Sequence, residues 1–95
     1  MDLGLKNKVL MVAASSKGLG FGIARQAALE GASLSLGSRS QKNINQAADK
    51  IMQEVHGAKV YSSVMDVSDP DSIEHWVKKT VEEFGVIDAL VVNGG

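Results

Sequence analysis

The chain has 95 residues, of which 44% are hydrophobic and 22% charged, with a formal net charge of -1 and no cysteine. These values fit one globular domain and exclude a disordered chain, disulfides and thiolate metal sites. The charge balance argues against nucleic acid or a membrane surface as partner. No apolar run approaches the roughly 20 residues of a membrane span, and the N-terminus lacks a secretory pattern, so we expect a cytoplasmic protein.

The first predicted strand runs from Lys8 to Ala14, because its apolar residues follow one another as in a strand buried on both faces. Helical spacing follows from Leu19 to Glu30, and Gly31 stands where a helix commonly stops. Apolar positions three and four residues apart predict one buried face, made of Leu19, Ile23, Ala24, Ala27 and Ala28.

A second strand is predicted from Ser33 to Leu36, followed by a helix that ends before Gly57. This helix has a single apolar stripe, composed of Ile44, Ala47, Ala48, Ile51, Met52 and Val55. Lys59 to Met65 then reads as a third strand, with Val60 and Val64 on one side and Tyr61 and Met65 on the other.

The third predicted helix starts with Ser68 as its N-cap and Pro70 in its first turn, and Gly85 closes it. Its apolar stripe consists of Ile73, Trp76, Val77, Thr80, Val81 and Phe84, which assigns Trp76 to the core and not to a stacking role. A fourth strand is predicted from Ile87 to Val92.

The order βαβαβαβ with short connections predicts an α/β fold, a doubly wound parallel sheet with helices on both faces. In such a sheet the strand order is 3-2-1-4, and the fourth strand has a further neighbour. Without that neighbour, residues 87–92 would form an exposed apolar edge. We therefore expect residues 1–95 to be the N-terminal part of one longer domain, with no second domain.

A glycine-rich turn, Gly18-Leu19-Gly20-Phe21-Gly22, joins the first strand to the first helix. Such a turn can hold a phosphate, because glycines let the backbone approach and the first N–H groups of a helix lack internal partners. The third glycine comes one place early for the general dinucleotide fingerprint G-x-G-x-x-G. A tight turn without a ligand therefore stays open as an alternative.

The longer segment resembles the cofactor loop of the short-chain dehydrogenase/reductase family, whose pattern is Thr-Gly-x-x-x-Gly-x-Gly. Gly18 and Gly20 match its last two glycines, while Ala13 and Ala14 stand where the family has Thr and Gly. Three further segments agree with the family in order and spacing, namely Glu30-Gly31-Ala32, Asp66-Val67 and Asn93-Gly94-Gly95, the last replacing the family's Asn-Ala-Gly.

This resemblance covers the whole chain and implies a Rossmann-type NAD(P)-binding domain, in which the Asp66 carboxylate contacts the adenine amino group. The residues that it implies for the cofactor are Ala14, Ser16, Lys17, Gly18, Leu19, Gly20, Arg39, Asp66, Val67, Asn93 and Gly94. Read without the family, Asp66 could instead cap the next helix, and Asn-Gly is a common turn.

The second strand indicates which nucleotide is bound. NAD-binding sheets usually carry a carboxylate about 20 residues beyond the glycines, for the ribose 2′-hydroxyl. Here that stretch is Gly37-Ser38-Arg39-Ser40, and the Arg39 guanidinium can bind a 2′-phosphate, with Lys17 as a second positive charge. We therefore predict NADP as the cofactor; the alternative is that both are ordinary surface charges.

The family's catalytic Asn, Ser and Tyr-x-x-x-Lys lie further along its chain than this sequence runs. Tyr61 is the only tyrosine, and Met65 follows four residues later where a lysine would be needed. We expect no catalytic residue here and no activity from these residues by themselves. His56 and His75 lack partners at metal spacing, so no metal site is predicted.

The resemblance thus implies an NADP-dependent oxidoreductase of carbonyl reductase or alcohol dehydrogenase type. Its Ser-Ser-Lys-Gly-Leu-Gly loop is similar to that of 3-oxoacyl-acyl-carrier-protein reductases, so the substrate would be a small-molecule or acyl-carrier-bound carbonyl compound. Family members commonly form dimers or tetramers. The alternative from another class is a non-catalytic nucleotide-binding or regulatory module, and a Tyr-x-x-x-Lys further along the chain would separate the two.

Overall fold

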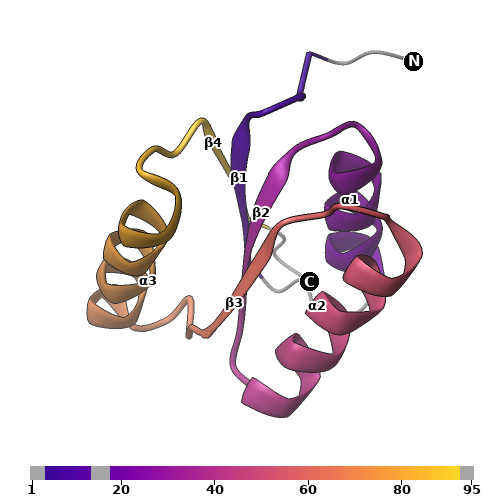
Figure 1. The fold of residues 1–95 in the computed structure, drawn as a ribbon. Helices are drawn as coiled ribbons and strands as arrows, with labels where there is room; N and C mark the ends of the chain where they lie inside the picture. Colours follow the sequence, from indigo (N-terminus) through magenta and orange to yellow (C-terminus); the bar gives the residue numbers. More distant parts are fainter. Residues whose placement is uncertain (1–3, 14–17, 93–95) are drawn as a thin grey trace.

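The computed structural model describes residues 4–13 and 18–92 of the chain. Within these ranges four parallel strands form one sheet in the order β3-β2-β1-β4, as the sequence predicts. Helices α1 and α2 cover one face of the sheet and α3 covers the other (Figure 1). The elements are β1 (Val9–Ala13), α1 (Gly18–Leu29), β2 (Ser33–Ser38), α2 (Gln41–Glu54), β3 (Val60–Val64), α3 (Pro70–Phe84) and β4 (Ala89–Val92).

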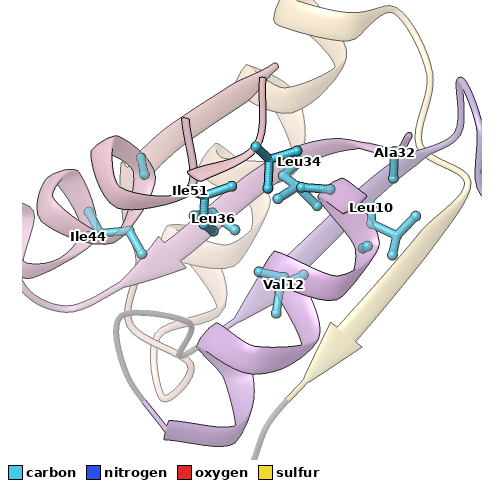
Figure 2. Packing of buried hydrophobic residues seen from close by; sticks show 12 residues of the cluster. Leu10, Val12, Ala32, Leu34, Leu36, Ile44 and Ile51 are labelled. Atoms are coloured by element: carbon cyan, nitrogen blue, oxygen red, sulfur yellow. The ribbon is translucent and has the colours of Figure 1, made fainter. Parts of the chain in front are cut away.

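The two faces of the sheet have separate hydrophobic clusters, because successive side chains of a strand point to opposite faces. Leu10 and Val12 of β1, with Leu34 and Leu36 of β2, pack against α1 and α2 (Figure 2). The intervening residues of β1 pack against α3, in a smaller cluster of Met11, Ala13, Met65 and Trp76. The continuous apolar run of β1 is thus explained by burial on both faces.

Strand β2 is two residues longer than the sequence predicts. Gly37 pairs with Ala13 of β1 and with Ser63 of β3, and Ser38 pairs with Val64. Glycine and serine have little tendency to form strands by themselves, so the sequence predicts this strand only as far as Leu36. Pairing on both sides of Gly37, and with β3 at Ser38, holds this segment in the sheet and overrides the local preference.

A buried polar network joins β2 to α3. The indole N–H of Trp76 donates to Ser35 Oγ at 2.9 Å, and Ser35 Oγ lies 2.7 Å from Thr80 Oγ1. Thr80 Oγ1 in turn donates to the backbone oxygen of Trp76 at 2.8 Å. Since the single Thr80 hydroxyl proton goes to that oxygen, Ser35 is the donor to Thr80. Every donor therefore has an acceptor, as buried polar groups require.

Gly37 lets the Trp76 ring lie directly against the backbone of β2. A Cβ at this position would come within 3.0 Å of Trp76 Cε2 and Cζ2 and 3.2 Å of Met65 Cβ. The core role predicted for Trp76 is confirmed, because its side chain is 1% exposed. Its polar bonds to Ser35 and Thr80 were not foreseen from the apolar stripe.

Strand β4 is held at its beginning by Asp88. The Val9 N–H donates to Asp88 Oδ2 at 2.7 Å, and the Asp88 N–H donates to the Val9 oxygen at 2.9 Å. Within the described residues β4 pairs with β1 on one side, and its side chains Leu90 and Val92 are 48% and 61% exposed. The expected apolar edge is therefore present.

Three residues predicted to lie on buried helix faces are exposed. Leu19 is 71% exposed, Met52 41% and Val81 43%. Leu19 lies in the first turn of α1, and Met52 and Val81 lie at the margins of their stripes, so the neighbouring positions cover the sheet. Ala24, Ala27, Ala28, Ile44 and Ile51 are buried as predicted.

The N-cap predicted for α3 is wrong by one residue. Asp69 caps the helix, and its side chain accepts from the Asp71 N–H at 3.0 Å. Ser68 donates instead to Asp66. The helix end is as predicted: Gly85 has φ 82°, a left-handed conformation that favours glycine.

The close contact at Gly37 leads to a prediction for stability. Gly37→Ala should lower the free energy of unfolding by about 1–3 kcal/mol, because the added methyl group overpacks the Trp76 ring. Urea unfolding measures this change. The matched control is Gly22→Ala in α1, where a Cβ would meet no atom of the described residues within 4 Å. That change should be neutral or stabilising by up to about 1 kcal/mol, and equal effects at both positions would contradict the packing argument.

Candidate functional site

The carboxyl ends of parallel strands meet at one edge of the sheet, where α/β proteins bind ligands. Ala13 at the end of β1 is level with Gly37, and Ser38 at the end of β2 is level with Val64. Helix α1 begins with Gly18, Arg39 directly follows β2, and Asp66 follows β3. The structure thus brings three of the predicted segments to one edge, which we call the carboxyl edge.

The glycines at the start of α1 differ in what requires them. Gly18 has φ 68°, and a Cβ there would meet no atom of the described residues within 4 Å, so its backbone conformation favours glycine. Gly20 is buried in the first turn, whereas Leu19 between them is exposed. The exposure of Leu19 is compatible with the predicted cofactor contact, although it contradicts the predicted burial.

Arg39 is an exposed residue between the end of β2 and the start of α2. The next residue, Ser40, caps α2 by accepting from the Asn43 N–H at 3.2 Å. Within the described ranges the Arg39 side chain has no hydrogen bond or ion pair to another residue. Its guanidinium donors are therefore available to a ligand.

Asp66 is held by the segment that leads into α3. Its Oδ1 accepts from the Ser68 N–H at 2.9 Å and from Ser68 Oγ at 2.7 Å. Its own N–H donates to Ser72 Oγ at 3.0 Å. Asp66 is thus not the cap of α3, and the alternative reading of this residue as a cap is wrong.

The pKa of Asp66 lies below its ordinary value of 3.8. The Ser68 N–H contributes most, followed by the Ser68 hydroxyl, and the positive charge of Arg39 acts in the same direction, whereas desolvation opposes them. These donors stabilise the ionised carboxylate. Arg39 and Asp66 follow neighbouring strand ends, since the Met65 N–H donates to the Ser38 oxygen at 2.8 Å.

The remaining predicted site residues divide into two groups. Val67, next to Asp66, is 54% exposed, as a residue that borders a ligand can be. The others, Ala14, Ser16, Lys17, Asn93 and Gly94, lie outside the described residues.

The serines around Asp66 were not predicted as site residues. Ser68 donates to the side chain two residues earlier, a recurring local motif of Asp and Ser. The Asp66-Val67-Ser68 spacing carries that signal, but Ser68 was assigned to the helix cap. Ser72 gives no such signal, because its contact depends on how α3 folds back.

Two cavities lie at the opposite edge of the sheet, where the strands begin. The larger has a volume of about 630 Å³ and the smaller about 170 Å³, and Asn7, Ser33, Ala58 and Lys59 line both. No predicted site residue lines them. In the described part of the chain no three His, Asp or Glu side chains come together as a metal site, and no helix there has the length and apolar character to cross a membrane.

Comparison with known proteins gives the family. A family model described as short chain dehydrogenase matches residues 8–95. The short-chain dehydrogenase/reductase SDRA of Arabidopsis thaliana is 40% identical over 89 residues, which are 94% of this chain and 34% of the relative. The 3-oxoacyl-acyl-carrier-protein reductase of Chlamydia muridarum is 35% identical over 95 residues, or 100% of this chain and 38% of the relative.

A solved structure supports the same assignment. L-sorbose reductase from Gluconobacter frateurii, complexed with NADPH and L-sorbose, has a TM-score of 0.93 and 34% identity. The match covers 100% of this chain and 36% of that chain. The parallel sheet with helices on both faces, and the candidate site at its carboxyl edge, define an α/β protein of the Rossmann type. The chain belongs to the short-chain dehydrogenase family of oxidoreductases, and it spans about a third of the length of these relatives.

The Ser68 contacts predict how Asp66 titrates. Ser68→Ala removes the hydroxyl donor and should raise the pKa of Asp66 part of the way to its ordinary value, since the Ser68 N–H remains. A carboxyl with a lowered pKa stabilises the fold above its ordinary pKa and loses this contribution as pH falls through the lowered value. NMR titration of the Asp66 carboxyl group measures the shift. The control is Ser63→Ala, because the Ser63 hydroxyl donates to the Val64 oxygen and not to Asp66; the pKa of Asp66 should stay unchanged in this variant. An unchanged pKa of Asp66 in Ser68→Ala would contradict the role of the Ser68 hydroxyl as its donor.

Proposed function

We propose that residues 1–95 form the N-terminal part of a single NAD(P)-binding domain and hold the adenosine and pyrophosphate of NADP. In this proposal the complete protein is an oxidoreductase that transfers a hydride between the nicotinamide and a carbonyl or alcohol group. The observation that carries the choice of NADP is the exposed Arg39 directly after β2, whose side chain has no hydrogen bond or ion pair to any other described residue.

Arg39 stands where NAD-binding sheets carry a carboxylate for the ribose 2′-hydroxyl. A guanidinium has the donor geometry for a phosphate, and its charge is unaffected by pH in the physiological range. No carboxylate occurs between Gly31 and Lys42 to repel a 2′-phosphate. The NADPH complex of the sorbose reductase supports the same cofactor class.

The other described residues fit the same nucleotide. The start of α1 carries Gly18 and Gly20, which allow a pyrophosphate to approach the helix N-terminus. Asp66 follows β3, next to the end of β2, and would offer its carboxylate to the amino group of adenine. The proposal adds Ala14, Ser16, Lys17, Asn93 and Gly94 to this site on the family resemblance.

The chemical step belongs to residues that this sequence does not contain, and we propose that these 95 residues are inactive by themselves. The substrate class is a carbonyl compound, either a small molecule or one bound to an acyl carrier, as the names of the reductase relatives suggest. We further propose, on the family resemblance, that the complete protein forms dimers or tetramers. Cofactor binding without any hydride transfer by the intact protein would favour the non-catalytic module instead.

The test of the cofactor is the ratio of the NAD and NADP dissociation constants. Arg39→Asp should reduce the preference for NADP about ten- to a hundredfold, because a charge-assisted hydrogen bond is lost and a like charge faces the phosphate. Isothermal titration calorimetry on the intact protein gives both constants.

The matched control is Lys59→Asp, which makes the same change of charge at the opposite edge of the sheet. Its ratio should stay as in the unmodified protein. An unchanged ratio in Arg39→Asp, or equal shifts in both variants, would contradict NADP recognition by Arg39.

A further inference from the structure

The two hydrogen bonds from Ser68 to Asp66 end on the same oxygen. The Ser68 N–H and the Ser68 hydroxyl both donate to Oδ1, at 2.9 and 2.7 Å. The hydroxyl has no role in starting α3, because Asp69 caps that helix. The Ser68 hydroxyl therefore binds the carboxylate of Asp66 and does not cap the helix.

This arrangement leaves the other oxygen of the carboxylate available. Throughout residues 4–13 and 18–92, no group forms a hydrogen bond to Asp66 Oδ2. An ionised carboxylate can accept about four hydrogen bonds. Two donors on one oxygen restrict the rotation of the carboxylate. The Asp66 N–H also donates to Ser72 Oγ at 3.0 Å, which holds the backbone of Asp66 in place.

We propose that Ser68 is a positioning residue that holds Asp66 by Oδ1 so that Oδ2 can accept from the amino group of a bound adenine. The inference rests on the proposed nucleotide site and adds the element that makes it selective for the base. Ser68 itself does not touch the nucleotide in this arrangement.

Base selectivity follows from the charge of the carboxylate. Adenine presents an amino group, a donor, to Asp66 Oδ2. Hypoxanthine has a carbonyl oxygen at that position, so acceptor would face acceptor. The donors from Ser68 stabilise the ionised form of Asp66, and they are also the main cause of its lowered pKa. A carboxylate free to rotate would lose part of this discrimination, because the hydrogen bond to adenine would first have to order it.

The experiment compares two dinucleotides on the intact protein, NADP and its hypoxanthine analogue, nicotinamide hypoxanthine dinucleotide phosphate. Calorimetry gives the ratio of their dissociation constants. We expect a preference for NADP of about tenfold or more in the unmodified protein, from one hydrogen bond to a charged group. Ser68→Ala should reduce this ratio at least threefold, whereas Ser68→Thr, which retains the hydroxyl, should preserve it.

The control Ser63→Ala removes a serine hydroxyl that bonds the Val64 oxygen at 3.3 Å and not Asp66. It should leave the ratio unchanged. Circular dichroism checks that each variant is folded.

The positioning role of Ser68 would be overturned if Ser68→Ala kept the full preference for NADP over the hypoxanthine analogue. An equal loss of affinity for both dinucleotides would overturn it too. Equal binding of both dinucleotides by the unmodified protein would overturn it as well, because Asp66 would not read the base. If the unmodified protein binds neither dinucleotide, the proposed function fails, and this result differs from all the others.

Discussion

The contact of Trp76 with β2 is the constraint on which the α3 side of the molecule depends. The indole lies against Gly37, where a Cβ would come within 3.0 Å of the ring, and its N–H is bound by Ser35. Thr80 closes the network back to α3. A buried network with every group satisfied permits few other arrangements. Because α3 begins four residues after Asp66, its position also determines where Ser72 meets Asp66.

The same strand connects the core to the ligand edge. Ser35 and Gly37 face α3, Leu34 and Leu36 face α1 and α2, and two residues after Gly37 the chain presents Arg39. Arg39 thus follows a segment buried on both faces, which restricts its backbone while its guanidinium stays exposed. Asp66 directly follows the buried Met65, although β3 itself is only partly buried. Rigid strands that end in polar residues are the arrangement that a nucleotide site requires.

The sequence predicts most of this fold, because hydrophobic periodicity reports how each element is buried. The strand order, the two faces of the sheet and the core position of Trp76 follow from pattern and chirality. The predictions failed where a tertiary contact decides. Gly37 and Ser38 belong to β2 because of neighbours that are distant in sequence, and Asp69 caps α3 because Ser68 is bound to Asp66. Asp66 was predicted through the family resemblance and Arg39 from the missing carboxylate after the second strand, and the structure adds that both follow neighbouring strands at one edge.

The most direct test of the account is where a nucleotide binds on the sheet. Adding NADP to the isotopically labelled intact protein should shift the amide NMR signals of Gly18, Arg39 and Asp66, at the carboxyl edge. The signals of Asn7, Ala58 and Lys59, which line the cavities at the opposite edge, should remain in place. Shifts concentrated at these cavity residues, with the carboxyl edge unaffected, would contradict the account.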